Sequence, residues 1–126
     1  MRRDARDPLS GVVIESAIAV HRAIGPGLLE SVYQCCLAHE LRKRGVRFET
    51  GCRLPLRYDG VELNTYFRLD LLVERELVVE LKSVQGLHPV HVAQALTYLK
   101  LAGLQRALLI NFNVPKLLEG VKRVSL

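Results

Sequence analysis

The residues whose types and spacing could support chemistry lie in one short segment, RLDLLVERELVVELKSV, residues 68–84. Two apolar runs flank a charged stretch, which is typical of a β-hairpin. If the turn takes residues 74–76, the pairing places Asp70 opposite Glu80. Arg68 then lies opposite Lys82. Like charges that face each other in this way repel by up to about 1 kcal/mol on a wet surface, so the hairpin predicts a partner that offsets the repulsion.

A divalent cation between Asp70 and Glu80 would provide that offset. Mg²⁺ favours a few carboxylate oxygens together with waters and a substrate phosphate. Lys82 follows Glu80 by two residues and lies on the same strand face, where it could orient or deprotonate a water for attack on phosphorus. The alternative is a salt-bridge network on a solvated sheet face, in which Arg68 pairs with Asp70 and Lys82 pairs with Glu80.

The opposite face of the same hairpin is wholly apolar. Side chains alternate between the two faces of a strand, so the odd-numbered positions share one face. That face consists of Leu69, Leu71, Val73, Leu77, Val79 and Leu81. It must lie on a core, which leaves the two acids and the lysine on the other face.

The segments around the hairpin must position these residues. Apolar spacing predicts helices over about residues 11–24, 28–44 and 90–101. Strand patterns begin at residue 46, continue on both sides of a tight turn at Asp59-Gly60, and recur at residues 106–112 and in the C-terminal GVKRVSL. This order of elements predicts an α/β fold in which helices flank a mixed β-sheet.

Polar residues on inward faces of two predicted helices add to the candidate site. Glu30 shares an arc with Leu37 and Leu41. Because a buried carboxylate is costly unless it is paired or bound to metal, Glu30 is expected to point at a cation, a lysine or a polar cavity, with an arginine pair at the rim as the alternative. Gln94 and Tyr98 face inward on the later helix, where they could hold a water or a phosphate, or satisfy backbone groups at a sheet edge.

Composition and charge predict one globular domain. A length of 126 residues allows a single core, which we assign to residues 11–126 after an N-terminal tail over residues 1–10. No apolar stretch approaches the roughly 18 residues that span a bilayer, and there is no signal-like segment, so a cytoplasmic protein without a membrane partner is expected. Three cysteines without metal-ligand spacing fit that compartment, and the net charge of +5 suits a polyanion such as nucleic acid.

Several segments resemble, in the same order, those of a known protein family. GLLESVY, residues 27–33, matches the GxxExxY motif that names a family of small bacterial and archaeal proteins. ELRKRG, YDG, ELKSV, HVAQALTYLK and LLINF follow it. The resemblance covers about residues 14–124, and that family is placed in the PD-(D/E)XK superfamily, whose motif is an acid, a variable gap and then acid-x-lysine.

The resemblance implies a restriction-endonuclease-like three-layer sandwich and a nuclease that uses Mg²⁺ or Mn²⁺. Asp70 would be the first acid, and Glu80 and Lys82 would be the acid-x-lysine pair. The expected metal ligands are Asp70, Glu80 and the backbone carbonyl of Leu81, while Lys82 would position the nucleophilic water. The remaining expected site residues are Glu30 as the helix acid, Gln94 and Tyr98 as a Q-x-x-x-Y element that holds the water or the nucleic-acid backbone, and Arg68 as a nucleic-acid contact.

Two positions depart from the family pattern, and two other function classes fit the same residues. Leu69 stands where the superfamily label has proline, and Gly51 stands where a polar residue is expected. A non-catalytic module that binds nucleic acid or protein is the first alternative, and a structural subunit with salt-bridged acids is the second. DNA is the expected substrate. One small domain that cuts both strands would need a partner, which makes a homodimer one option.

Overall fold

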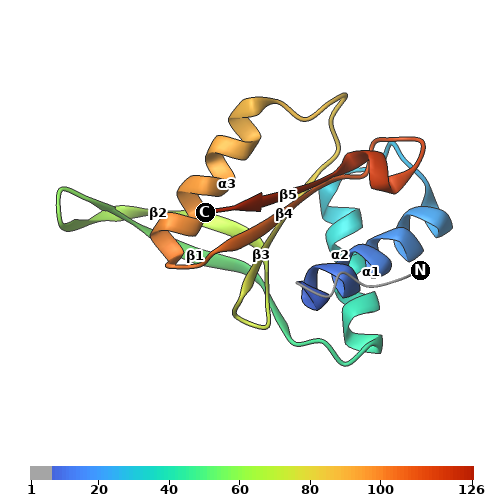
Figure 1. Ribbon diagram of the computed structural model, residues 1–126, viewed down its shortest axis with the longest axis horizontal. Helices are drawn as coiled ribbons and strands as arrows, with labels where there is room; N and C mark the ends of the chain where they lie inside the picture. Colours follow the sequence, from blue (N-terminus) through green and yellow to red (C-terminus); the bar gives the residue numbers. More distant parts are fainter. Residues whose placement is uncertain (1–6) are drawn as a thin grey trace.

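The structure is a computed structural model that describes residues 7–126. Residues 1–6 of the predicted tail lie outside the described residues. The elements are α1 (Pro8–Ile24), α2 (Glu30–Lys43), β1 (Phe48–Tyr58), β2 (Val61–Val73), β3 (Leu77–Lys82), α3 (Pro89–Ala102), β4 (Arg106–Asn111), the short 3-10 helix η1 (Leu117–Gly120) and β5 (Val121–Ser125). Their order confirms the predicted succession of helices and strands (Figure 1).

The five strands form one mixed sheet in chain order. β1, β2 and β3 are antiparallel neighbours, β3 and β4 are parallel, and β5 returns antiparallel to β4. A parallel pair needs a long crossover, and α3 supplies it. The mixed α/β sheet predicted from the sequence is therefore confirmed.

Two turns set the register of the strands around the candidate site. Asp59 and Gly60 have φ angles of 54° and 72°, the left-handed conformation that a two-residue hairpin turn requires. In the next hairpin Val73 pairs with Leu77, so the turn takes residues 74–76, as predicted. Leu72 accordingly pairs with Val78.

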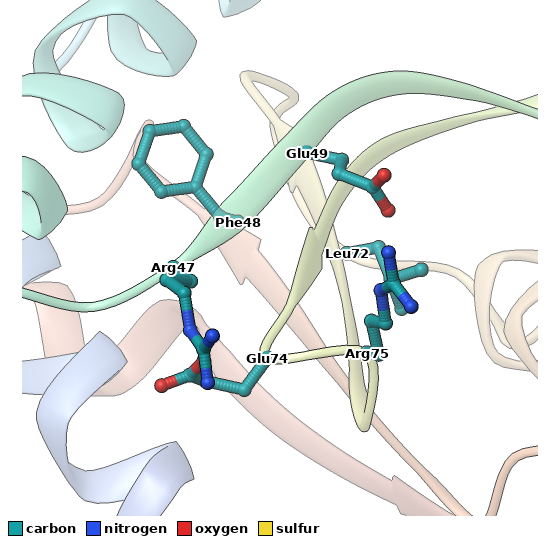
Figure 2. A pocket seen from close by; sticks show the side chains of 6 residues that line it. All are labelled: Arg47, Phe48, Glu49, Leu72, Glu74 and Arg75. Atoms are coloured by element: carbon teal, nitrogen blue, oxygen red, sulfur yellow. The ribbon is translucent and has the colours of Figure 1, made fainter.

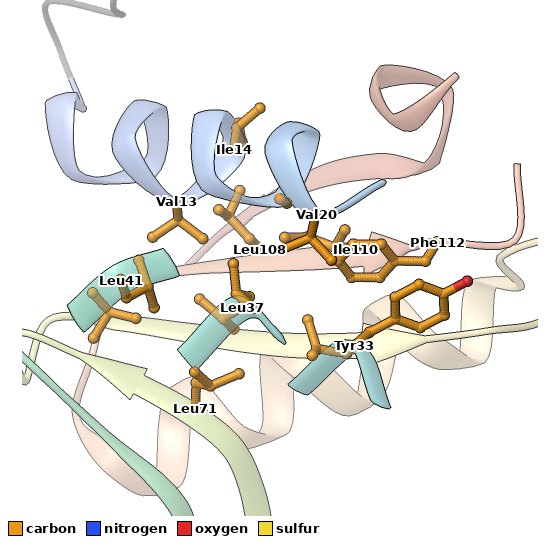
Figure 3. Close-up of a cluster of buried hydrophobic side chains, with 14 of the residues drawn as sticks. Val13, Ile14, Val20, Tyr33, Leu37, Leu41, Leu71, Leu108, Ile110 and Phe112 are labelled. Carbon is orange, nitrogen blue, oxygen red and sulfur yellow. The ribbon is translucent and has the colours of Figure 1, made fainter. Parts of the chain in front are cut away.

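Helices cover both faces of the sheet, which gives three layers (Figure 1). On one face, side chains of α1 and α2 meet the sheet in a dry cluster that includes Val13, Val20, Tyr33, Leu37, Leu71 and Leu108 (Figure 3). On the other face, α3 packs through Ala95, Tyr98 and Leu99. Each such side chain, once buried, stabilises the fold by about 1.5–3 kcal/mol.

The odd-numbered face of the β2–β3 hairpin is buried as predicted, but it contributes to two cores. Leu71 and Val79 pack beneath α1 and α2, whereas Leu69 belongs to the cluster of α3. The change occurs at Asp70, where β2 leaves β3, and Gly51 on the neighbouring strand has a φ of 61° there. A left-handed residue bends the strand locally, which turns this part of the hairpin toward α3.

Helix starts differ from the predicted ones by a few residues. α1 begins at Pro8 and not at Gly11, because Asp7 caps it by accepting the Ser10 backbone N–H at 3.2 Å. Residues 8–10, which the sequence analysis assigned to the tail, therefore belong to α1. α2 begins at Glu30 and not at Leu28. None of the helices within residues 7–126 combines the length and the apolar character needed to cross a membrane.

Candidate functional site

β2 and β3 separate where the predicted acids stand. Backbone pairing between the two strands ends at Leu71 and Val79. Beyond that pair, the backbone N–H of Asp70 donates to Oε1 of Glu80 at 3.2 Å, and the N–H of Leu81 donates to Oδ2 of Asp70 at 2.8 Å. The two carboxyl groups thus take the place of ladder bonds and lie together in the fork between the strands.

The environment of Glu80 makes its ionised form unfavourable. Glu80 is only 5% exposed, although its neighbour in the fork, Asp70, is half-buried. The pKa of Glu80 is raised from 4.5 to about 8, first by burial and then by repulsion from Asp70, although the hydrogen bond from the Asp70 backbone N–H opposes the rise. Glu80 can therefore keep its proton at neutral pH beside the Asp70 carboxyl group.

Lys82 lies near the acids without forming an ion pair. Its positive charge lowers the pKa of Glu80, but less than the other causes raise it. No ion pair between residues of the described range 7–126 involves Asp70, Glu80 or Lys82. The described structure therefore does not contain the salt-bridge network that was the alternative interpretation of this hairpin.

Arg68 does not face Lys82, because the two strands acquire different neighbours at the fork. β2 continues along β1, where Arg68 pairs with Arg53 and its guanidinium lies against Gly51. β3 continues along β4, and the Lys82 carbonyl accepts the N–H of Phe112 at 2.9 Å. The predicted pairing of these two cations is therefore wrong.

α3 brings Tyr98 to the fork, whereas Gln94 lies on its rim. Tyr98 is buried, and its pKa is raised by burial and then by the charges of Glu80 and Asp70. A hydrogen bond with the Gln94 side chain partly opposes this shift. Gln94 itself is exposed, so its predicted inward position is wrong. It stands at the border of the buried stripe, from which its amide reaches the Tyr98 hydroxyl.

Glu30 is exposed, which corrects the expectation that it faces the core. The stripe that includes Tyr33, Leu37 and Leu41 does point inward, but Glu30 is the first residue of α2 and lies beyond the end of the core. Its charge acts on His91 of α3, whose pKa is lowered by burial and by Lys82 and raised by Glu30. The net effect is a lowered pKa of His91, on which the charges of Lys82 and Glu30 act in opposite directions.

Hydrogen bonds that no local pattern predicted hold the start of α2 against the end of β3. The hydroxyl of Ser83, directly after Lys82, donates to the carbonyl of Leu28 at 2.6 Å. The hydroxyl of Tyr33 donates to the carbonyl of Gly25 at 2.6 Å and accepts the N–H of Leu28 at 3.2 Å. The Tyr33 ring stacks on Phe112 at 4.2 Å between centroids, which anchors the arrangement to the core (Figure 3).

Asn111, like Ser83, has a positioning role that was not predicted from the sequence. It is 2% exposed and forms a reciprocal pair with the backbone after β3, because its Nδ2 donates to the Val84 carbonyl at 2.9 Å and its Oδ1 accepts the Val84 N–H at 3.1 Å. This pair fixes the path of the chain that leaves Lys82. The signal that the sequence offers for it is an asparagine within the apolar run of residues 106–112.

The oxygen ligands of the fork fit a hard divalent cation better than a metal that prefers thiolate or imidazole ligands. No group of three or more His, Cys, Asp or Glu side chains within residues 7–126 is arranged to hold an ion. Two adjacent carboxyl groups are, however, ligands of the kind that Mg²⁺ takes, together with several waters and substrate phosphates. A cation in the fork would replace the proton that the raised pKa leaves on Glu80.

A separate hollow of about 450 Å³ lies at the turn of the hairpin and not at the fork. Figure 2 shows the side chains that line it, Arg47, Phe48, Glu49, Leu72, Glu74 and Arg75. Arg47 and Glu74 form an ion pair of 3.1 Å there. Because no predicted site residue lines this hollow, it is not the candidate site.

A mixed five-stranded sheet between two helix layers, with acids and a lysine at a strand fork, defines a restriction-endonuclease-like domain. A family model of the PD-(D/E)XK nuclease superfamily matches residues 7–124. The match covers nearly the whole chain, and the chain belongs to this superfamily. Comparison with curated proteins gave no match, and comparison with solved structures gave none.

Proposed function

We propose that the chain hydrolyses phosphodiester bonds of nucleic acid, with DNA as the expected substrate, at the fork between β2 and β3. Membership of a nuclease superfamily supports the reaction class. The observation that carries the proposal is the convergence of Asp70 and Glu80, which exchange hydrogen bonds with each other's strands while the pKa of Glu80 is raised to about 8. Perturbed carboxyls of this kind are typical of functional sites.

Mg²⁺ or Mn²⁺ is the cofactor that the donor set suits. Asp70, Glu80 and the backbone carbonyl of Leu81 would hold it, and it would supply positive charge to the phosphate and to the attacking water. Glu80 would give up its proton on binding, because carboxylates ligate in the ionised form.

The other residues around the fork would orient the reactants. Lys82 would position the nucleophilic water and stabilise the negative charge that grows on the phosphate. Tyr98, with Gln94 bonded to its hydroxyl, would hold the water or the nucleic-acid backbone. Glu30 would act from the start of α2, beside Lys82 and His91, and Arg68 would contact the nucleic acid.

The GxxExxY family is the narrower assignment that we propose within the superfamily. Each fixed position of its motif has a physical role in this fold. Gly27 has a φ of 90°, which other residues rarely adopt, Glu30 starts α2 beside the fork, and Tyr33 bonds the turn from within the core. We also propose a cytoplasmic setting, which the three free cysteines suit, and a homodimer for cleavage of duplex DNA, which sedimentation velocity would reveal.

Calorimetric titration with Mg²⁺ and Mn²⁺, followed by incubation with a panel of DNA and RNA, tests the proposed reaction. Asp70→Asn should lose both metal binding and cleavage, whereas Lys82→Ala should bind metal and lose cleavage. Glu76→Gln, which removes an exposed acid from the turn of the same hairpin, should behave as wild type. Cleavage retained in both Asp70→Asn and Lys82→Ala would refute the proposal. Metal-independent binding without turnover would replace it with a nucleic-acid-binding module.

A further inference from the structure

The distal half of the β1–β2 hairpin forms an arm that extends beyond the rest of the sheet (Figure 1). Pairing within the arm runs from Cys52 and Leu69 to Tyr58 and Val61, with one irregularity after Pro55. One side of the arm rests on α3 through Leu54 and Phe67 at its base. Among residues 7–126, no helix packs on the other side of the arm.

The uncovered side is basic. Arg53 pairs directly with Arg68 and Pro55 with Tyr66 on this side, and Arg57 pairs with Glu62 beyond the irregularity, nearer the tip of the arm. We call these six residues the arm face. All six residues are exposed. Three arginines stand against one glutamate, so the arm face carries a net positive charge.

Arg53 and Arg68 form a second juxtaposition of like charges, this time of cations. They are direct partners in the antiparallel ladder, an arrangement that costs up to about 1 kcal/mol when nothing offsets it. Within residues 7–126, no ion pair involves Arg53, Arg57 or Arg68. Gly51 lacks the side chain that would collide with the Arg68 guanidinium, which leaves that group room to lie across β1.

An aromatic ring lies among these cations. The Arg53 guanidinium sits 4.5 Å from the centroid of the Tyr66 ring, and Tyr66 remains 49% exposed. Such a contact holds an arginine in place without neutralising it. The arm face therefore presents ordered positive charge and an aromatic edge, a combination that suits phosphates and bases.

We propose that the arm face binds the phosphodiester backbone of a nucleic acid and guides it to the fork. The inference deepens the proposed function, on which it rests, because Arg68 lies only two residues from the site residue Asp70 along β2 and the arm therefore begins next to the fork. Residues 53–57 span about 13 Å of strand, which matches about four nucleotides of one DNA strand. A two-stranded ribbon of this kind also fits the major groove of a duplex. The excess of arginines favours a polyanion over a second copy of this basic chain.

Binding without cleavage isolates the arm from the reaction. Fluorescence anisotropy with labelled duplex and single-stranded oligonucleotides would be measured in EDTA over a series of salt concentrations. The test variant is Arg53→Gln/Arg57→Gln, and the matched control is Arg22→Gln/Lys100→Gln, which removes two exposed cations from α1 and α3. Unchanged circular dichroism would show that both variants fold.

The arm variant should raise Kd about tenfold or more at 0.1 M salt and reduce the slope of log K against log salt by about 1.5–2, as expected for two lost phosphate contacts. The control should change neither quantity appreciably. Equal losses in both variants, wild-type affinity in the arm variant, or no binding by the wild type would overturn the proposal. So would sedimentation showing that the substitutions break a dimer.

The same assay separates this inference from the proposed reaction. Asp70→Asn should still bind through the arm while it no longer cleaves. If the wild-type chain binds nucleic acid through the arm but never cleaves it, the proposal for the arm would stand and the proposed nuclease activity would be refuted.

Discussion

The hydroxyl of Ser83 donates a 2.6 Å hydrogen bond to the carbonyl of Leu28, although 55 residues separate them in the chain. Ser83 directly follows Lys82, and Leu28 stands two residues before Glu30. The bond therefore links the strand that carries the proposed catalytic lysine to the helix start that carries the proposed helix acid.

Ser83→Ala should lower kcat of the proposed cleavage by about tenfold or more, since small displacements of positioning groups have effects of that size. Loss of one such hydrogen bond should lower the free energy of unfolding by only about 0.5–1.5 kcal/mol. Single-turnover cleavage and urea denaturation would measure the two effects. Ser83→Thr, which keeps the hydroxyl, should restore kcat, and equal rates for wild type and Ser83→Ala would contradict this positioning role.

Tyr33→Phe removes a single hydroxyl group but should destabilise the fold markedly. The ring would still stack on Phe112, but the carbonyl of Gly25 and the N–H of Leu28 would lose their partner. Because Tyr33 is fully buried, we expect a loss of about 1–3 kcal/mol in the free energy of unfolding, measured by urea denaturation. The exposed Tyr58→Phe is the matched control and should change it little. Similar values for both variants would mean that the turn does not depend on this hydroxyl.

Glu80→Gln should stabilise the metal-free protein increasingly as pH rises. The pKa of Glu80 is raised to about 8 in the folded chain by burial and by Asp70, whereas the unfolded chain releases this proton near pH 4.5. Between those values the folded state binds more protons than the unfolded state, so wild-type stability falls as pH rises, by roughly 1 kcal/mol per pH unit. Glutamine removes this dependence and keeps an oxygen that can accept the Asp70 N–H.

Urea denaturation in EDTA at pH 5 and pH 8 would measure the pH effect. The difference between Glu80→Gln and wild type should be small at pH 5 and large at pH 8. Mg²⁺ added at pH 8 should then stabilise the wild type more than the variant. A difference that does not vary with pH would show that Glu80 ionises freely in the folded chain.

The hairpin register and the pair of acids were predictable because they depend on local rules. Alternation of side chains and a three-residue turn were enough to bring Asp70 to Glu80, and the structure agrees as far as Leu71 and Val79. The fork beyond that pair was not predictable, because there β2 pairs only with β1 and β3 pairs only with β4, which no local pattern indicates. For the same reason the position of Arg68 was missed.

Helical periodicity predicts which side of α2 a residue lies on, but it does not predict how far along the helix the core extends. It placed Glu30 on the stripe of Tyr33 and Leu37, yet Glu30 lies past the end of that core. The bonds of Ser83 and Asn111 connect residues that are far apart in sequence, so no local pattern marked them.

Asn111→Asp should destabilise the fold in a way that low pH relieves. Asn111 donates to the Val84 carbonyl at 2.9 Å and accepts the N–H groups of Val84 and Asn113 at 3.1 and 3.2 Å. An ionised aspartate could accept both N–H groups, but it would place a buried negative charge against the Val84 carbonyl. We expect a loss of about 1–3 kcal/mol at neutral pH. Protonation would restore a donor, so the pKa of the new carboxyl should be raised and stability should recover as pH falls. Urea denaturation at pH 4.5 and 7.5 would measure the loss of stability relative to wild type, with the exposed Asn64→Asp as the control. An equal loss at both pH values would show that the hydrogen bond donated to the Val84 carbonyl does not stabilise the chain after Lys82.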